Sequence, residues 1–490
     1  MGSEMCIRDS REIEKWGDAK QRLRRDFPPR AGTGGPADRD ATLRIPNAGP
    51  ARQRALVLLC RTNGKFLMEK RVLLVATTIG YQIRSFGEAA RKLGVRLMFV
   101  TDRCDRLDDP WRDQAIAVRF HDEDRSVEAV VAACGSAVPD GVVAVGDRPA
   151  VLAARLAGAF GFSWHPPDAA RISRNKLFAR RAFKSAGLPT PRFRTVSLDD
   201  EVRSRVASFP YPAVVKPLAL SGSRGVMRVD NPDQCVDALR RLRRLLASPD
   251  VLVERDHVHR RALVESFISG PEYAVEGILE HGRFHPLAIF DKPDPLDGPF
   301  FEETIYLAPS LAADDVQQRI LECVADGARA IGLHHGPVHA ECRVSGSSVY
   351  LLEVAARPIG GLCSRSLRFV NDQTDETVTL EEVVLRHALG ERVDAYRREP
   401  LASGVMMIPI ARRGIFRSAE GIDNARGVPG VEDVRITAKR GALVVPLPEG
   451  RSYLGFIFAR GSGPGLVERS LRAAHGRLHF VLDRELPVIG

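Results

Sequence analysis

The sequence predicts a multidomain chain that combines α/β and α+β architecture. At 490 residues it is too long for one compact core, so about three domains are expected. Between residues 70 and 170, continuous apolar strands alternate with amphipathic helices, which indicates a parallel sheet covered on both faces. Strands and long polar helices mix after residue 188, and short strands with paired glycine turns follow residue 401.

The composition is that of a soluble globular protein. Hydrophobic residues make up 44% and charged residues 27% of the chain. The longest apolar run near the start, Ala55–Cys60, is too short to span a bilayer, and no stretch has the order of a secretory signal. The eight cysteines are scattered without a C-x-x-C pair, as is typical of reduced thiols. We therefore expect a cytoplasmic protein with no membrane partner.

The formal net charge of +10 does not indicate nucleic-acid binding. Residues 1–67 contain fourteen Lys and Arg against eight Asp and Glu, a surplus of +6, which leaves only about +4 for the rest. A phosphate-binding footprint should instead cluster on the folded domains.

Residues 1–67 differ in style from the rest of the chain. They are Arg-rich, contain Pro-Pro and Gly-Gly breaks and lack sustained periodicity. Met1–Ser10 resembles sequencing-adapter read-through, and Met68 stands just before a clean strand. We expect 1–67 to be a disordered or non-native extension, Met68 to be the initiator, and the chemistry to lie elsewhere.

The region 68–170 is predicted to be a Rossmann-like domain. Its expected elements are strands Arg71–Ala76, Arg96–Thr101 and Gly141–Val145, and a helix from Asp147 to about Phe160. We expect Asp147 to cap that helix, with Pro149 in its first turn. The region has no G-x-G-x-x-G after its first strand and the chain has no P-loop motif, which argues against a dinucleotide oxidoreductase or a P-loop NTPase.

A hairpin between residues 336 and 357 carries the most specific chemical signal. Polar residues at 339, 341 and 343 alternate with apolar ones, which predicts a half-buried strand, and 349–357 alternates likewise. A three-residue loop, Gly346–Ser348, would place Ser345 opposite Val349.

In that register Arg343 faces Leu351 and Glu341 faces Glu353. Directly opposed carboxylates repel unless a cation lies between them, and hard oxygen ligands at this spacing suit Mg²⁺. The alternative is a solvated strand face, since a one-residue slip would put Glu341 and Glu353 on opposite faces.

Segments upstream of the hairpin contain groups that a nucleotide would need. Pro212–Pro217 is an apolar strand ending at Lys216, and the small-residue loop Ser221–Gly225 follows. Such a loop lets backbone N–H groups approach phosphates, and the lysine supplies counter-charge. Taken singly, this loop, Lys176 and the strand edge Leu263–Glu272 are also compatible with ordinary turns and solvated side chains.

The order of these motifs resembles the ATP-grasp superfamily. Lys176, then Lys216 with its glycine loop, V-E-x-x-[ILF]-x-G-x-E from Val264 and E-x₁₁-E-x₃-R from Glu341 occur in the order that this superfamily shows. The chain is most similar in style to L-amino acid ligases, with kinship to D-alanine–D-alanine ligases. The resemblance covers about 70–490 and includes Gly404–Pro409 and Ser452–Arg460, which resemble the C-terminal module of L-amino acid ligases. It implies an ATP-grasp domain at 171–400 with a lid at about 180–262, and a small β-rich C-terminal domain at 401–490.

The resemblance also implies a role for each motif. The ATP-binding residues would be Lys176, Lys216, Ser221, Gly222, Ser223, Gly225, Glu265, Ser266, Ile268 and Glu272. Of these, the two lysines would meet phosphates, 221–225 would close as a mobile lid loop, and 265–268 would meet the adenine. Glu272 would meet the ribose hydroxyls. Glu341 and Glu353 would bind Mg²⁺, with Mn²⁺ as an alternative ion.

The remaining implied roles concern the substrates. Arg357 would be the catalytic residue that stabilises the transferring phosphoryl group and then the oxyanion. Substrate contacts would come from Glu303, His339, Gly360 and Gly361. Two positions depart from many relatives. Ala355 replaces an Asn that would ligate Mg²⁺, which leaves the number of ions open, and Tyr306 replaces a substrate-binding His, which leaves the substrate open.

The implied reaction is ADP-forming ligation of a carboxylate to an amine through an acyl phosphate. The expected partners are these two small molecules, with an amino acid as one or both, and a homodimer is an open alternative. Rival readings are carboxylation through carboxyphosphate, ligation to a thiol, and a non-catalytic ATP-binding module.

Overall fold

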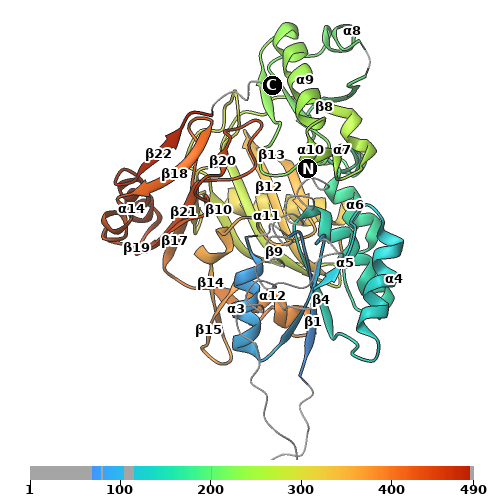
Figure 1. Ribbon diagram of the computed structural model, residues 1–490, viewed down its shortest axis with the longest axis vertical. Helices are drawn as coiled ribbons and strands as arrows, with labels where there is room; N and C mark the ends of the chain where they lie inside the picture. The colour runs from blue at the N-terminus through green and yellow to red at the C-terminus, as the bar shows by residue number, and fades with distance from the viewer. Residues whose placement is uncertain (1–68, 79–80, 104–114, 200, 486–490) are drawn as a thin grey trace, which may run out of the picture. The chain divides into compact units, whose positions relative to one another are not determined.

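The computed structural model describes residues 69–78, 81–103, 115–199 and 201–485, which belong to one compact unit (Figure 1). The expectations for residues 1–67 and for Met68 lie outside the described residues. Within the described ranges, no helix is both long enough and apolar enough to cross a membrane.

The first layer is the parallel sheet that the sequence predicts. Its strands are β1 (Arg71–Ala76), β2 (Arg96–Thr101), β3 (Ile116–Ala117) and β4 (Gly141–Val145), in the order β3-β2-β1-β4 with parallel pairing. Helices α3 (Ile83–Leu93), α4 (Glu123–Cys134) and α5 (Asp147–Phe160) flank it. Val72–Val75 are fully buried, as continuous apolar strands of a covered parallel sheet should be.

The start of α5 differs from the prediction in one respect that matters for the site. Gly146 occupies the cap position with a φ of 99°, and no side chain caps the helix. Asp147 is the first helical residue, and its carboxylate pairs with Arg357 instead. The prediction that Asp147 caps α5 is therefore wrong, because a distant arginine binds its carboxylate.

Two helices lead from this layer toward the centre of the molecule. They are α6 (Pro167–Arg174) and α7 (Lys176–Ser185), and α7 packs on α6 and α11. Asn175 caps α7 by accepting hydrogen bonds from the amides of Leu177 and Phe178. The cap fixes Lys176 at the first turn of α7.

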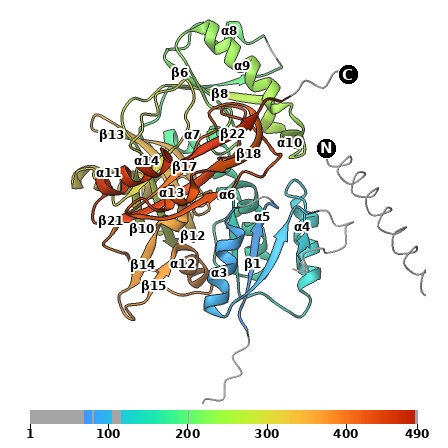
Figure 2. The same ribbon diagram turned by 60° about the vertical axis from the view of Figure 1, so that its left-hand side comes forward.

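A second, antiparallel sheet has its own core within the predicted lid. It comprises β5 (Phe193–Ser197), β6 (Ala213–Pro217), β7 (Met227–Val229) and β8 (Arg261–Ser266), in the order β5-β8-β6-β7. Its helices are α8 (Arg203–Val206), α9 (Pro232–Leu246), α10 (Pro249–Leu252) and the 3₁₀ turn η1 (His257–Arg260). The apolar face of α9, with Leu239 and Leu242 buried, covers this sheet (Figure 2).

The central sheet has eight antiparallel strands and joins the predicted second and third domains. In order across the sheet these are β13 (Ser348–Ala355), β12 (Gly336–Ser345), β9 (Glu272–Glu280), β10 (Arg283–Asp291), β11 (Ile305–Ala308), β17 (Ala402–Ile408), β21 (Gly455–Gly461) and β19 (Val431–Ile436). Residues 401–490 are β-rich as expected, but three of their strands extend the sheet of the preceding region through the β11–β17 pairing.

The remaining elements include the strands of two further three-stranded sheets. They are α11 (Asp314–Ile331), η2 (Cys363–Ser366), β14 (Arg368–Asn371), β15 (Thr377–Thr379), α12 (Leu380–Ala388), β16 (Tyr396–Arg398), β18 (Gly414–Glu420), α13 (Ile422–Arg426), β20 (Leu443–Val444), α14 (Pro464–His475) and β22 (His479–Asp483). Helix α14 lies against β17 and β21 (Figure 2).

The β12–β13 hairpin has the predicted central pairing with a different turn. Its loop is the two residues Gly346 and Ser347, so Ser345 pairs with Ser348 rather than Val349. Arg343 consequently faces Tyr350, not Leu351. A bulge shifts the register next to Cys342, and Glu341 therefore faces Glu353 as predicted.

Strand β12 is also more buried than the prediction of a half-buried strand allows. All its residues are buried except Glu341 and Ser345, which are intermediate. One face packs on α11, and the other carries His339 and Arg343, which are buried in ion pairs with carboxylates. The polar face of β12 therefore lines a charged interior and not the solvent.

Candidate active site

A cavity of about 640 Å³ lies where the first layer, the lid sheet and the central sheet meet. Residues from all three layers line it, including Asp147 from α5, Lys216 from β6 and Glu341 from β12. Every predicted site residue lines this cavity except Gly225. Residues that are scattered over about 180 positions of the sequence thus face one cavity.

The predicted metal-binding pair lies on the β12–β13 hairpin, which lines this cavity. Glu341 and Glu353 face each other across β12 and β13. Lys176 Nζ lies 3.0 Å from Glu353 Oε2 and donates to the carbonyl of Leu220 at 2.8 Å. Lys176 thus contacts one member of the pair. Because it comes from the start of α7, tertiary packing brings the lysine and the hairpin carboxylate together.

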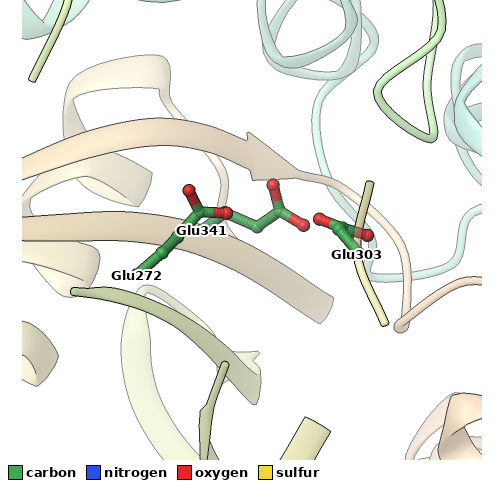
Figure 3. A group of neighbouring side chains, drawn as sticks. All are labelled: Glu272, Glu303 and Glu341. Carbon is green, nitrogen blue, oxygen red and sulfur yellow. The ribbon is translucent and has the colours of Figure 1, made fainter. Parts of the chain in front are cut away.

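A second carboxylate group adjoins Glu341. Figure 3 shows Glu272 and Glu341 on neighbouring strands and Glu303 on the segment before β11, with their carboxylates directed toward one another. One ligand atom from each lies within 4.8 Å of the others, a spacing that could hold a metal ion.

Lys292 supplies a positive charge to this group. Its Nζ lies 2.8 Å from Glu272, 2.7 Å from Glu303 and 3.2 Å from Glu341. Burial would lower the pKa of Lys292, but the three carboxylates raise it well above its usual value. The sequence analysis missed Lys292, because a lysine that follows strand β10 has no local feature to distinguish it from a solvated one.

Glu272 is already engaged in this arrangement. One carboxylate oxygen accepts from Lys292, and the other accepts from Arg343 Nε at 2.8 Å. Arg343 also donates to the carbonyl of Ile268 at 2.8 Å, which joins two of the predicted nucleotide-binding positions. The ribose contact predicted for Glu272 stays a prediction.

The pKa values of the Glu303 and Glu341 carboxyl groups are shifted in opposite directions. Burial and the charge of Glu341 raise the pKa of Glu303 to about 7. Burial would also raise the pKa of Glu341, but Lys292 and His339 hold it well below the usual range. Glu341 is therefore a permanent anion suited to a cation, whereas Glu303 can take up or release a proton near neutral pH.

A buried histidine–carboxylate pair lies behind Glu341. His339 Nδ1 is 3.0 Å from Glu276 Oε2, and its Nε2 is 3.7 Å from Glu341 Oε1. Burial would lower the pKa of His339, but hydrogen bonds to these carboxylates raise it to about 9. Glu276, which the sequence analysis missed, also accepts from the amide of Ile359 at 3.1 Å and so anchors the backbone next to Gly360 and Gly361.

Arg357 is held by a residue of the first layer. Its Nε lies 2.6 Å from Asp147 Oδ1 and its Nη2 lies 3.2 Å from Asp147 Oδ2, so the ion pair is bidentate. Its Nη2 is also 3.7 Å from Glu353 Oε1. Burial would raise the pKa of Asp147, but Arg357 lowers it. The first layer thus orients the predicted catalytic arginine toward the metal pair.

The predicted phosphate-binding lysine of β6 belongs to a buried three-residue network. Lys216 Nζ is 2.7 Å from Glu265 Oε2, and Arg180 Nε is 2.5 Å from Glu265 Oε1. Burial opposes ionisation of Glu265, but the two cations lower its pKa to about 2. Burial lowers the pKa of Lys216. Arg180 had no signal in the sequence, since it lies mid-helix among other arginines.

The glycine-rich loop after β6 adopts left-handed backbone geometry at three positions. The φ angles are 64° at Gly222, 53° at Ser223 and 76° at Gly225. A Cβ at Gly225 would stand 2.9 Å from Leu242 Cδ1, so only glycine fits there. Ser221, Gly222 and Ser223 line the cavity, and Gly225 anchors the loop from outside it.

The two departures from the family pattern have visible consequences. Ala355 pairs with His339 across the hairpin and is 2% exposed, so it offers no side-chain oxygen to an ion. Tyr306 directs its hydroxyl to Glu341 Oε1 at 3.4 Å, and its ring lies 4.9 Å from Lys292 Nζ. Tyr306 thus supports the carboxylate group.

Two family models match the chain. The ATP-grasp domain model matches residues 209–366, and the model of L-amino acid ligase C-terminal domain 2 matches residues 406–483. The first match contains Lys216, the glycine loop, the carboxylate group and Arg357, whereas Lys176 and Asp147 precede it.

Curated relatives match over part of their length. A Sinorhizobium fredii protein, the uncharacterized protein y4rH, is 28% identical over 64% of this chain and 63% of its own. The alanine–anticapsin ligase of Bacillus subtilis is 25% identical over 49% of this chain and 52% of its own. The chain thus spans between half and two thirds of the length of these relatives.

Among solved structures, the L-amino acid ligase of Bacillus licheniformis has the same fold. The two superpose with a TM-score of 0.69 at 24% identity, over 85% of this chain and 99% of that one. The mixed α/β architecture with several sheets is therefore an ATP-grasp fold.

Proposed function

Because this chain belongs to the ATP-grasp superfamily and carries an L-amino acid ligase C-terminal domain, we propose that it joins a carboxylate to an amine with ATP as co-substrate. The products would be an amide-type C–N bond, ADP and phosphate. An amino acid would be one or both of the joined substrates, as the name of the alanine–anticapsin ligase suggests for that relative.

The observation that carries this proposal is the set of paired carboxylates and cations at the floor of the cavity. Glu341 and Glu353 oppose each other, and Lys176, Lys292 and Arg357 lie within 4 Å of one or other of them. Phosphoryl transfer to a carboxylate brings anionic groups together, and cations held in fixed positions beside them would stabilise the transition state.

The residues present fit a magnesium ion. Glu341 is held ionised, Glu353 faces it directly, and both offer the oxygen ligands that Mg²⁺ takes together with phosphates and water. Bound there, Mg²⁺ would neutralise charge on the ATP phosphates. Ala355 adds no ligand, so the number of ions stays open.

In the first step the substrate carboxylate attacks the γ-phosphorus of ATP. The P–O bond to ADP breaks, and an acyl phosphate forms. Lys176 and Lys216 would bind the phosphates, and the loop 221–225 would exclude water above them. Arg357, kept ionised and oriented by Asp147, would stabilise the charge on the transferring group.

In the second step the amine attacks the acyl carbon. The tetrahedral state collapses, the C–O bond to phosphate breaks, and phosphate leaves. Arg357 and the backbone amides of Gly360 and Gly361 would stabilise the oxyanion. An ammonium substrate must first lose a proton, and Glu303, which lines the cavity beside Glu341, would accept it.

We extend the proposal to the division of the chain. A Rossmann-like domain would span 68–170, the ATP-grasp domain 171–400 with a lid at about 180–262, and the ligase-type domain 401–490. The parallel first sheet, the separate core of the lid sheet and the matched C-terminal module support this division. The protein would act in the cytoplasm, and a homodimer is compatible with the proposal.

The test is phosphate release from Mg²⁺-ATP by the full chain, with amino acids supplied singly and in pairs. We expect release that needs two substrates, yields ADP and vanishes in Glu353→Ala. The control is Glu322→Ala, an exposed glutamate of α11 that should leave the rate unchanged. Release that needs only bicarbonate, or ATP binding without turnover on any pair, would contradict the proposal.

A further inference from the structure

A tight turn of the C-terminal module reaches the glycine loop of the lid. The turn spans residues 446–450, after β20, and is closed by the amide of Gly450, which donates to the carbonyl of Pro446 at 2.9 Å. A Cβ at Gly450 would stand 1.9 Å from the carbonyl oxygen of Val445. The shape of this turn is therefore set within the C-terminal module and does not depend on the lid.

Three contacts join the turn to the lid. The amide of Gly225 donates to the carbonyl of Pro448 at 2.8 Å, and Arg224 Nε donates to the carbonyl of Glu449 at 2.9 Å. The carboxylate of Glu449 accepts from Arg241 Nε at 2.5 Å and from Arg241 Nη2 at 2.8 Å. We call Glu449 together with Arg224 and Arg241 the latch. Arg224, from the glycine loop, contacts the backbone carbonyl of Glu449, whereas Arg241, from α9, contacts its carboxylate. The carboxylate therefore ties α9 to the turn directly and the glycine loop through the turn.

The latch lies at the rim of the cavity. Arg224 lines the cavity and donates to Asp250 Oδ2 at 2.8 Å, and Arg451, which also lines it, lies 3.4 Å from the same oxygen. Ser221, Gly222 and Ser223, the part of the loop that faces the cavity, directly precede Arg224. The position of Arg224 thus determines where the loop stands above the proposed phosphate site.

The exposure of the latch indicates that it can open. The side chains of Glu449 and Arg241 are 37% and 39% exposed, so water competes for their charges. Two-pronged pairing gives the contact a defined geometry, whereas a pair this exposed adds only modest stability. A lid that admits ATP and releases ADP needs contacts of this strength.

We propose that Glu449 is a positioning residue, which holds the glycine loop closed over the cavity so that the acyl phosphate meets the amine and not water. The proposal rests on the ligase function proposed above. With the loop loosened, water would attack the acyl carbon, a new C–O bond would form, and the C–O bond to phosphate would break. The carboxylate would be regenerated, and ATP would be hydrolysed to ADP and phosphate without ligation.

The first experiment measures phosphate released per amide formed, using the full chain and a substrate pair that the wild type accepts. Glu449→Ala should raise this ratio, with the phosphate released in excess of amide growing about two- to fivefold, the population change that loss of one exposed ion pair allows. ATP consumption should persist while ligation falls. The charge swap Arg241→Glu with Glu449→Arg should lower the ratio again, which a general loss of folding would not do.

The matched control is Glu485→Ala. Glu485 forms a similar bidentate pair with Arg413, at 2.6 and 3.2 Å, and both residues belong to the C-terminal module, so this pair does not join the module to the lid. Its ratio should equal that of the wild type. Equal ratios in Glu449→Ala and the wild type would overturn the proposal.

The second experiment follows the loop without relying on ligation. Amide hydrogen exchange of residues 221–226 is measured with a non-hydrolysable ATP analogue bound. We expect faster exchange in Glu449→Ala than in the wild type or Glu485→Ala, and unchanged exchange would refute the latch. Faster exchange in a protein that ligates no substrate pair would refute the ligase function and leave the latch in place.

Discussion

Replacing Arg180 by methionine should strongly destabilise the protein, although Arg180 lies outside the proposed chemistry. Arg180 is 1% exposed and connects α7 to two sheets. It pairs with Glu265 on β8, and it donates to the carbonyls of Leu351 at 2.7 Å and Leu352 at 3.0 Å on β13. Methionine fills a similar volume but leaves the two carbonyls without this donor and Glu265 with Lys216 as its remaining cation.

The size of the effect follows from two independent considerations. The shift of the Glu265 pKa from 4.5 to about 2 corresponds to about 3 kcal/mol of native-state stabilisation, which Arg180 and Lys216 share. The two orphaned carbonyls add about 1 kcal/mol or more each. A total near 4 kcal/mol agrees with the roughly 3–5 kcal/mol expected on breaking a buried ion pair.

Thermal unfolding at pH 7 measures this change. We expect the melting temperature of Arg180→Met to fall by about 5 °C or more. The control Arg329→Met removes an exposed i,i+3 pair with Asp326 and should shift the melting temperature little. Because the pKa of Glu265 is depressed, its contribution is present above pH 4.5 and is lost as the pH falls toward 2, so the difference between variant and wild type should narrow in acid. A fall of less than 1 °C at pH 7 would refute the reasoning.

Two further predictions concern the charged interior. The pKa of His339 is raised to about 9, so its pairing with Glu276 stabilises the fold fully below pH 6.5 and loses that effect as the pH rises through 9. Unfolding midpoints from pH 6 to 10 should therefore fall more steeply for the wild type than for His339→Asn, and parallel curves would contradict this. Lys292→Gln leaves Glu272, Glu303 and Glu341 without their shared cation, so Mg²⁺ should raise its melting temperature more than that of the wild type or of the exposed-site control Lys92→Gln. Equal shifts with Mg²⁺ in all three proteins would argue against Lys292 as the counter-charge.

The hairpin shows how far sequence periodicity carries a site prediction. Alternation of polar and apolar residues was enough to oppose Glu341 and Glu353, and the structure confirms that pair. It was not enough for the turn, where a two-residue loop and a compensating bulge replace the predicted three-residue loop. No local feature of this sequence predicts the bulge. The predicted pairing of Glu341 with Glu353 is therefore correct, whereas the predicted pairing of Arg343 with Leu351 is wrong.

The missed residues share a different cause. Lys292, Glu276 and Arg180 act through partners that lie between 11 and 172 positions away in the chain. Each has an ordinary local sequence, and only the packing of strands and helices makes it a counter-charge to a residue that lines the cavity. Asp147 illustrates the same limit, since a helix cap and a partner for Arg357 look alike until the first sheet is placed against the central one.

The sequence by itself determined the local elements and the identity of the reactive groups. Strands Arg71–Ala76, Arg96–Thr101 and Gly141–Val145 have their predicted bounds, because apolar runs and glycine stops act over a few residues. The motif order likewise pointed to the ATP-grasp family. The tertiary structure alone decided which charged groups contact one another, and it shifted the pKa values of Glu303 and Glu341 in opposite directions. It also decided that the C-terminal module shares the central sheet and contacts the lid. These properties depend on burial and on distances between segments far apart in sequence, and local pattern carries no information about either.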